Sequence, residues 1–159
     1  PAFKMDNGAK HGINGIKGGL GEQAAINLID ECFPNRYKNV LDHSNDCIAQ
    51  LQGIDLTFIG ESIITVDVKS GRSGLYYNSD RGYWYITIRE EFFNDPKKTN
   101  THFMHVGPKK DRFVLYEKKL MHQFFIENPK CFNKVDGDNY TRYVLKRNNW
   151  PDFAFDNLY

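Results

Sequence analysis

Two aspartates and a lysine interrupt the apolar stretch over residues 53–70, GIDLTFIGESIITVDVKS. If the turn of a hairpin lies at residues 60–62, Asp55 stands directly opposite Asp67, and Lys69 projects from the same face. Residues opposed in this way have Cβ atoms about 4.5–5.5 Å apart, so the two carboxylates repel each other unless a positive charge lies between them. These residue types therefore indicate a cation site on a pair of strands.

The alternation of side chains favours this register. It puts a wholly apolar set of residues on one face, and it places Thr57 opposite Thr65 on the face of the acids. A slip of one residue would place Asp55 opposite Val66 and mix the two faces. Carboxylate oxygens are hard ligands that suit Mg²⁺, which usually takes one or two carboxylates together with water. Lys69 lies within reach of a water molecule bound to such an ion.

A polar face on a hairpin has an ordinary alternative explanation. Antiparallel sheets often turn a polar face to water, and Asp-x-Lys is a common tripeptide. A catalytic role for the polar face is favoured by Glu22, a further acid in the first turn of an amphipathic helix upstream of the hairpin.

The order of these residues resembles the PD-(D/E)xK nuclease superfamily, which has a helix glutamate, a strand aspartate and an acid-x-lysine triplet on the next strand. The segments GLGEQAAINLIDECF, GIDLTF and ITVDVKS carry the resemblance, which covers residues 18–70. Within the superfamily, the layout looks most like Holliday-junction resolvase-like and restriction-endonuclease-like members. Ile54 replaces the proline of the family name, and Asp67 replaces the commoner glutamate.

The resemblance implies a fold and a catalytic site. The fold is α+β (α/β), with a restriction-endonuclease-like core in which helices flank a mixed central β-sheet. Asp55, Asp67 and the carbonyl of Val68 would bind Mg²⁺ or Mn²⁺, and Glu22 would complete the site directly or through water. Lys69 would orient the attacking water and offset the charge of the transition state.

The elements that must position these residues follow from periodicity and turn signals. Apolar residues at helical spacing predict a helix from Leu20 to Cys32, which Pro34 ends. A short strand or loop begins at Val40. The other expected elements are a hairpin over 53–70, a hairpin over 74–88, a strand-turn-strand over 102–117, a helix over about 118–126 and one strand in the tail, 140–159.

Length favours a single domain over residues 1–159, which the resemblance implies is a nuclease domain. Residues 1–19 form a glycine-rich basic arm, residues 20–70 the catalytic core motif, and residues 71–159 the later hairpins, helix and aromatic tail. No apolar run is long enough to span a membrane. Three widely spaced cysteines argue against a disulfide framework and favour a reducing, cytoplasmic setting; a nucleus or a virus-infected cell stays open.

Nucleic acid is the expected partner, although a net charge of +1 does not by itself indicate nucleic-acid binding. Lys10, Lys17 and Arg72 are the favoured phosphate contacts, because they lie close in sequence to the catalytic elements. A cluster of aromatic residues over 76–85 either stacks on bases or packs within the protein. His102 and His105 are spaced to lie on opposite faces of a strand, which argues against a zinc site.

The sequence therefore favours a metal-dependent endodeoxyribonuclease acting on branched or duplex DNA. An RNA endonuclease or exonuclease of the same superfamily and a non-catalytic nucleic-acid-binding or assembly protein on the same fold are the alternatives. Cutting two strands needs two active sites, which suggests a homodimer. Either the arm, residues 1–19, reaches a neighbour or the tail WPDFAF is covered by one, unless that tail packs on its own domain.

Overall fold

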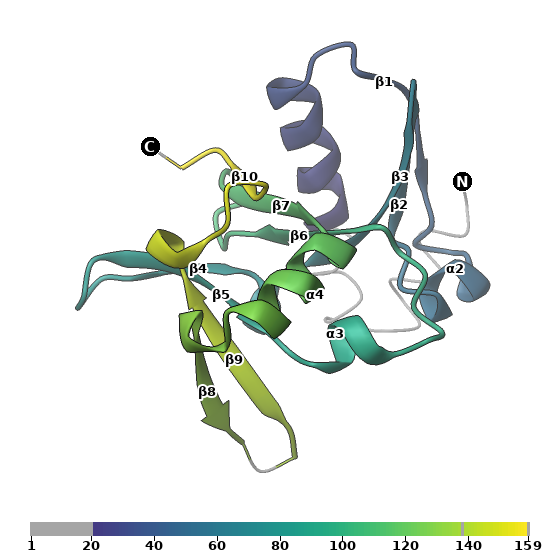
Figure 1. Ribbon diagram of the computed structural model, residues 1–159. Helices are drawn as coiled ribbons and strands as arrows, with labels where there is room; N and C mark the ends of the chain where they lie inside the picture. The colour runs from purple at the N-terminus through teal and green to yellow at the C-terminus, as the bar shows by residue number, and fades with distance from the viewer. Residues whose placement is uncertain (1–20, 138, 159) are drawn as a thin grey trace.

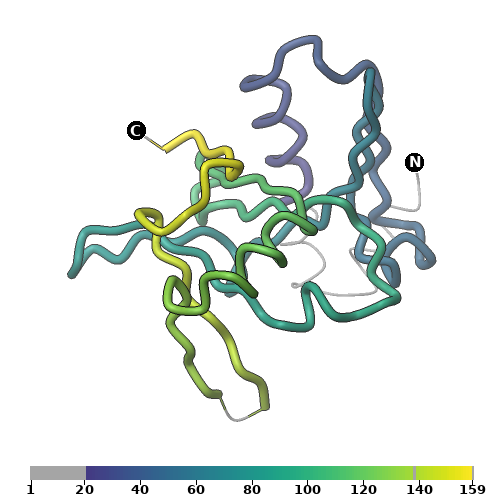
Figure 2. The backbone as a smooth tube through the Cα atoms, viewed as in Figure 1, coloured from purple at the N-terminus to yellow at the C-terminus, as the bar shows by residue number. Residues whose placement is uncertain are grey.

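The computed structural model describes residues 21–137 and 139–158, which form two β-sheets and four helices in those ranges (Figures 1 and 2). The helices cover residues 21–32, α2 (Cys47–Leu51), α3 (Glu91–Asn94) and α4 (Lys118–Glu127). The central sheet contains β1 (Tyr37–Asp42), β2 (Leu56–Gly60), β3 (Ile63–Lys69), β6 (His102–Val106), β7 (Phe113–Glu117) and β10 (Phe155–Asp156), in that spatial order.

The second sheet has four antiparallel strands in the order β4-β5-β9-β8. They are β4 (Leu75–Asn78), β5 (Tyr83–Ile88), β8 (Phe132–Asp136) and β9 (Thr141–Lys146). Single 3-10 turns occur at η1 (Gly71–Ser73), η2 (Pro129–Cys131) and η3 (Arg147–Asn149). Figure 1 shows the β4–β5 hairpin and the β8–β9 hairpin extending from the body of the molecule in different directions.

The central sheet is mixed, as predicted. β3 and β6 run parallel, whereas each of the other neighbouring pairs is antiparallel. A parallel pair requires a long crossover, and here the crossover holds β4, β5 and α3. With helices against the sheet, this architecture is α+β, which confirms the predicted fold class (Figure 1).

The predicted hairpin register is confirmed. Thr57 pairs with Thr65, and Leu56 pairs with Val66, so the even-numbered residues of β3 share a face with Leu56 and Phe58. That face is buried against the helix over residues 21–32 in a first core, which contains Ala24, Ala25, Leu28, Leu56, Phe58, Ile64, Val66, Met104, Val106, Phe113 and Leu115.

The second core lies on the opposite face of the central sheet. It joins β6 and β7 to α4 and to the inner face of the four-stranded sheet through Leu75, Ile86, Ile88, Phe103, Val114, Tyr116, Met121, Phe132 and Leu145. Because side chains alternate along a strand, Asp67 and Lys69 of β3 lie on this second face, beside Phe103 and His105 of β6. The two cores thus hold the polar face of the hairpin at a fixed place in the fold.

Several short elements had no clear signal in the sequence. α2, α3 and β8 were not predicted, and residues 140–159 hold two strands, β9 and β10, where one was expected. The short strand or loop predicted to begin at Val40 is the six-residue edge strand β1, which begins three residues earlier, at Tyr37. α2 and α3 are too short for helical periodicity to reveal them; α2 depends on Asp46, whose carboxylate accepts hydrogen bonds from the backbone N–H groups of Ile48 and Ala49.

The aromatic tail packs on its own domain. Trp150 and Phe153 lie against the second core, and Trp150 donates a 3.0 Å hydrogen bond from Nε1 to the carbonyl of Leu145. The ring of Phe155 lies 4.7 Å from that of Phe33. Of the two fates considered for this tail, packing within the domain is therefore the one observed.

The three cysteines, Cys32, Cys47 and Cys131, are all free thiols. Among the described residues, none of the helices combines the length and the apolar character needed to cross a membrane. Lys10 and Lys17, together with the rest of the glycine-rich arm, lie outside the described residues.

Candidate active site

The polar end of the β2–β3 hairpin begins at Asp55, the residue just before β2. Its backbone N–H donates a 2.9 Å hydrogen bond to the carbonyl of Val66, and its own carbonyl accepts one of 2.9 Å from the N–H of His43. Its side-chain Oδ2 accepts a 2.7 Å hydrogen bond from the N–H of Val68. The β2–β3 ladder ends at the Leu56–Val66 pair, and these bonds hold the Asp55 carboxyl against β3 just beyond it.

Asp55 and Asp67 form a close carboxyl pair. The two groups lie near enough to share a hydrogen bond. Burial, and then the negative charge of Asp67, raise the pKa of Asp55 to about 7, while the Val68 N–H and the Lys69 ammonium act in the opposite direction. At neutral pH, the pair is therefore poised between sharing a proton and carrying two negative charges.

Lys69 supplies a positive charge beside this pair. Its Nζ lies 3.3 Å from Oδ2 of Asp67, and the side chain is 24% exposed. The ammonium also lies 4.5 Å from the centre of the Phe92 ring, which packs beneath it from α3. One side of the ammonium is thus fixed by a carboxylate and a ring, which restricts the orientations of a long side chain.

The backbone of Val68 offers a further oxygen on the same side. A residue within a strand directs its N–H and its C=O toward the same neighbouring strand. The N–H of Val68 binds Asp55, and the ladder of β2 ends at Leu56. The carbonyl of Val68 therefore faces the space next to Asp55, where β2 has ended.

Glu22 lies near the start of the helix over residues 21–32 and is 8% exposed. Its neighbour Gly21 packs against Ser70: a Cβ added to Gly21 would lie 3.0 Å from the hydroxyl oxygen of Ser70. Ser70 directly follows Lys69, so this contact holds Gly21, the first described residue of the helix, at the end of β3. This part of the helix and the acid-bearing end of β3 are therefore neighbours in the fold.

Gly53 lies next to the Asp67 carboxylate. A Cβ added there would lie 3.5 Å from Oδ2 of Asp67, 3.2 Å from Oδ1 of Asn100 and 3.0 Å from Cδ of Lys98. The backbone of Gly53 also has a φ of +70°, which favours glycine. This turn therefore lets the loop over residues 95–101 approach the Asp67 carboxylate closely.

Lys118, the first residue of α4, is a basic residue that the sequence analysis did not single out. Its ammonium donates hydrogen bonds of 2.8 Å to the carbonyl of Lys98 and 3.1 Å to Oδ1 of Asn100. Burial lowers its pKa, and the charges of Asp67 and Asp95 act against that shift. A second ammonium group therefore lies within electrostatic range of the acid pair.

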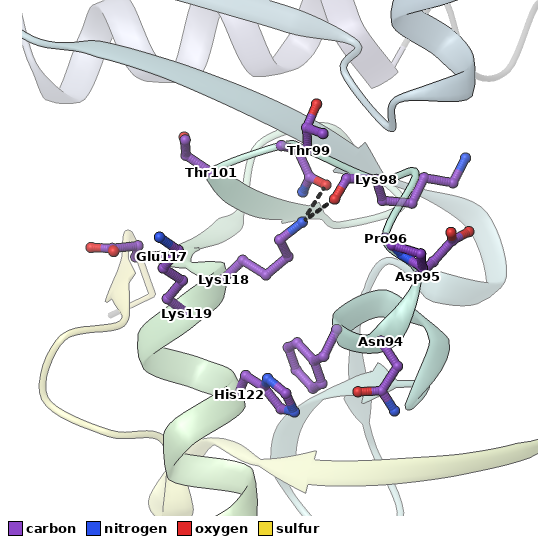
Figure 3. A pocket seen from close by; sticks show the side chains of 12 residues that line it. Asn94, Asp95, Pro96, Lys98, Thr99, Thr101, Glu117, Lys118, Lys119 and His122 are labelled. Carbon is purple, nitrogen blue, oxygen red and sulfur yellow. Dashed lines mark hydrogen bonds between the residues drawn. The ribbon is translucent and has the colours of Figure 1, made fainter.

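A pocket of about 440 Å³ opens between α3, α4 and the loop that joins α3 to β6. Figure 3 shows Lys118 reaching across it from α4 toward the loop that carries Lys98 and Thr99, with His122 further along α4. The ring of His122 stacks on Phe93 at 5.0 Å. Because Lys98, Asn100 and Lys118 line the pocket, it adjoins the acid pair.

His105 is a structural residue of this region. It is fully buried, its Nδ1 donates a 2.6 Å hydrogen bond to the carbonyl of Ser73, and its Nε2 accepts one of 2.7 Å from the Tyr116 hydroxyl. Burial lowers the pKa of His105 to about 3, so the ring is neutral at physiological pH. His102 and His105 lie at alternate-face positions of β6, as predicted.

The structure thus brings Asp55, Asp67, Val68 and Lys69 together and holds Glu22 at the adjoining helix start. Arg72 lies apart on η1, where it lines a groove of the second sheet. Within residues 21–137 and 139–158, no three acidic, histidine or cysteine side chains gather into a metal site of their own.

No protein-family model matches the chain, and no curated protein matches it. Solved structures that are similar to it at low identity include the following two. One is a bacterial homing endonuclease, I-Ssp6803I, at 19% identity over 81% of this chain and 72% of that one, with a TM-score of 0.46. The other is a nuclease from a fusselovirus, at 12% identity over 87% of this chain and 86% of that one, with a TM-score of 0.49. Neither likeness is close enough to carry an argument about activity.

Proposed function

We propose that this protein is a metal-dependent nuclease that hydrolyses phosphodiester bonds, with branched or duplex DNA as the favoured substrate of an endonuclease. The observation that carries the proposal is the close pair of Asp55 and Asp67 at the end of a hairpin, with the Lys69 ammonium 3.3 Å from Asp67. Two half-buried carboxyl groups that repel each other favour a cation between them.

The chemistry of the donors fits Mg²⁺ or Mn²⁺. Asp55, Asp67 and the carbonyl of Val68 offer hard oxygen ligands on one side of β3, and Mg²⁺ usually takes only one or two carboxylates. Glu22 would complete the site directly or through water. When bound, such an ion lowers the pKa of water and offsets charge on the phosphate.

The residues of the chain then have separate tasks. Asp55 and Asp67 hold the cation as a doubly ionised pair, so binding releases the proton that the pair retains near neutral pH. Lys69 orients the attacking water and donates a hydrogen bond to the phosphate oxygen on which charge develops. The Phe92 ring, whose centre lies 4.5 Å from the Lys69 ammonium, restricts the position of that group.

We further propose that the chain belongs to the PD-(D/E)xK superfamily. Support comes from the order of a helix that carries Glu22, an acid directly before β2, and an acid-x-lysine triplet on β3. The restriction-endonuclease-like core also accounts for a β3 that is antiparallel to β2 and parallel to β6. A homodimer would supply the two active sites needed to cut two strands.

A cleavage assay on a panel of substrates tests the proposal. Linear duplex, single-stranded and branched DNA and RNA are incubated with the protein in Mg²⁺ and, as a control, in EDTA. We expect Mg²⁺-dependent internal cleavage of duplex or branched DNA, leaving a 5′-phosphate. Cleavage of RNA alone, or only from strand ends, would replace this proposal with the corresponding alternative. Binding to the panel without any cleavage would favour a non-catalytic nucleic-acid-binding protein.

A further inference from the structure

We propose that the outer face of the four-stranded sheet binds a single strand of DNA, with bases stacked on tyrosine rings and phosphates held by arginines. In taking the strand to be DNA, this inference rests on the proposed function; the binding surface itself lies apart from the acid pair.

The alternation of side chains separates the aromatic residues of the β4–β5 hairpin. Ile86 and Ile88 of β5 are buried in the second core, so Tyr83 and Tyr85 lie on the opposite, outer face. Tyr76 of β4 pairs with Tyr85 and shares that face. The cluster of aromatic residues noted in the sequence is therefore split between core packing and an outer surface.

The outer face contains a groove of about 490 Å³. Six of the residues that line it carry the argument: Tyr76, Tyr83, Tyr85, Tyr140, Arg72 and Arg142. The rings of Tyr76 and Tyr85 stack with their centres 6.0 Å apart, and Tyr83 meets Tyr85 edge to face. A row of adjoining aromatic rings on a sheet is a platform on which successive unpaired bases can stack.

The charge of this face complements a phosphate backbone. Arg72 and Arg142 line the groove, and Nζ of Lys146 lies 4.8 Å from the centre of the Tyr83 ring. Arg89 lies just beyond β5, with its guanidinium 3.9 Å from the Tyr140 ring. No carboxylate is among the described residues that line the groove. Cations interleaved with aromatic rings favour an anionic polymer with exposed bases.

Stacking on these rings requires a single strand. In a duplex, the bases stack on one another, and a protein reaches only their edges and the phosphates. The sheet instead offers flat side chains, half-buried in a groove, to which an unpaired base can present its face. Duplex DNA and RNA are therefore competitors to be tested.

Two chain connections lead from this face to the acid pair. Arg72 follows Lys69 by three residues at the start of the crossover, and Phe92, whose ring lies under the Lys69 ammonium, follows Arg89 by three residues. A strand bound across the groove thus lies on elements that join directly to the candidate active site.

Fluorescence anisotropy with a labelled single-stranded DNA in EDTA tests this inference, because EDTA removes cleavage. We expect Tyr76→Ala to weaken binding about fivefold or more and Tyr76→Phe to retain most of it. Tyr77→Ala is the matched control, since Tyr77 is 51% exposed on the same strand but lies on the other face. Arg142→Ala should reduce the slope of log affinity against log salt concentration by about 0.7.

Equal losses in Tyr76→Ala and Tyr77→Ala would overturn the inference, as would a loss of duplex DNA or RNA binding in Tyr76→Ala at least as large as its loss of single-stranded DNA binding. Photo-cross-linking of a 5-iodouracil-containing strand to the wild-type protein provides a test that does not depend on a variant's folding. Cross-links at Tyr76, Tyr83, Tyr85 or Tyr140 support the groove, and cross-links confined to other residues contradict it. Asp67→Asn should bind the strand normally, so loss of cleavage and loss of binding are separate results.

Discussion

The backbone N–H of Val68 donates a 2.7 Å hydrogen bond to Oδ2 of Asp55. This bond ties the acid that precedes β2 to the middle of the Asp-Val-Lys triplet on β3. It holds one carboxyl group next to the other although burial and like charge oppose that arrangement. The fold thus keeps the carboxyl groups of Asp55 and Asp67 close together although they repel each other, and a bound cation would reduce this repulsion.

The contribution of Asp55 to the stability of the metal-free protein should fall as the pH rises from about 4 to about 7. The pKa of Asp55 is about 7 in the folded protein and near its ordinary value of about 3.9 in the unfolded chain. The folded state therefore binds more protons in that interval, and the contribution of this group to the free energy of unfolding decreases with pH.

Thermal unfolding in EDTA at about pH 5 and about pH 8 measures this effect. We expect the melting temperature to depend less on pH in Asp55→Asn than in the wild type, and Mg²⁺ to raise it most at the higher pH. An identical pH dependence in the two proteins would show that Asp55 carries no such shift.

Lys69→Met should reduce turnover by about 10²-fold or more while leaving metal affinity little changed. Methionine retains an apolar stem over Phe92 but removes the charge that serves the water and the phosphate. Single-turnover cleavage and a Mn²⁺ titration give the two quantities. Lys38→Met, at an exposed position on β1, is the control. Near-normal turnover in Lys69→Met would show that Lys69 has no catalytic role.

Glu22→Gln should weaken metal binding by about 10- to 100-fold, because a ligand or a partner of a metal-bound water would lose its charge. The size of the side chain is preserved, so the buried helix start should stay intact. The measurement is the Mg²⁺ concentration for half-maximal cleavage, with Glu31→Gln on the exposed side of the same helix as the control. Equal metal requirements in both variants would remove Glu22 from the site.

Periodicity in the sequence was sufficient to predict the elements that bury an apolar face. The helix over residues 21–32 follows from apolar residues at helical spacing, and the register of the β2–β3 hairpin follows from alternating side chains, because a slip of one residue would expose Leu56 and Phe58. The proximity of Asp55 and Asp67 is predicted by that register when it is extended one residue past its last pair, Leu56–Val66.

Contacts between distant segments had no signal in the sequence. Lys118 approaches Asp67 only because α4 packs near the loop that carries Asn100. Arg72, placed near the acids by sequence distance, lies instead on the groove of the second sheet, since β4 leads away from β3. Such placements depend on the long crossover between β3 and β6, which local patterns do not specify.

Sedimentation at micromolar concentration, with and without a branched DNA substrate, tests the proposed homodimer. We expect a dimer at least in the presence of substrate, because two nicks require two active sites. The tail packs within its own domain, so Trp150→Ala should affect stability before it affects assembly. A monomer under both conditions would favour a nicking enzyme or an exonuclease.

Mg²⁺-dependent cleavage by Asp67→Asn, compared with the wild type and with the control Asp152→Asn at an exposed position, tests the central claim most directly. The account predicts that the wild type and Asp152→Asn cut DNA in Mg²⁺, and that Asp67→Asn does not. The melting temperature of Asp67→Asn in EDTA should be unchanged or higher, because a repelling carboxylate is removed. Full cleavage by Asp67→Asn would contradict the claim that the Asp55–Asp67 pair forms the catalytic metal site.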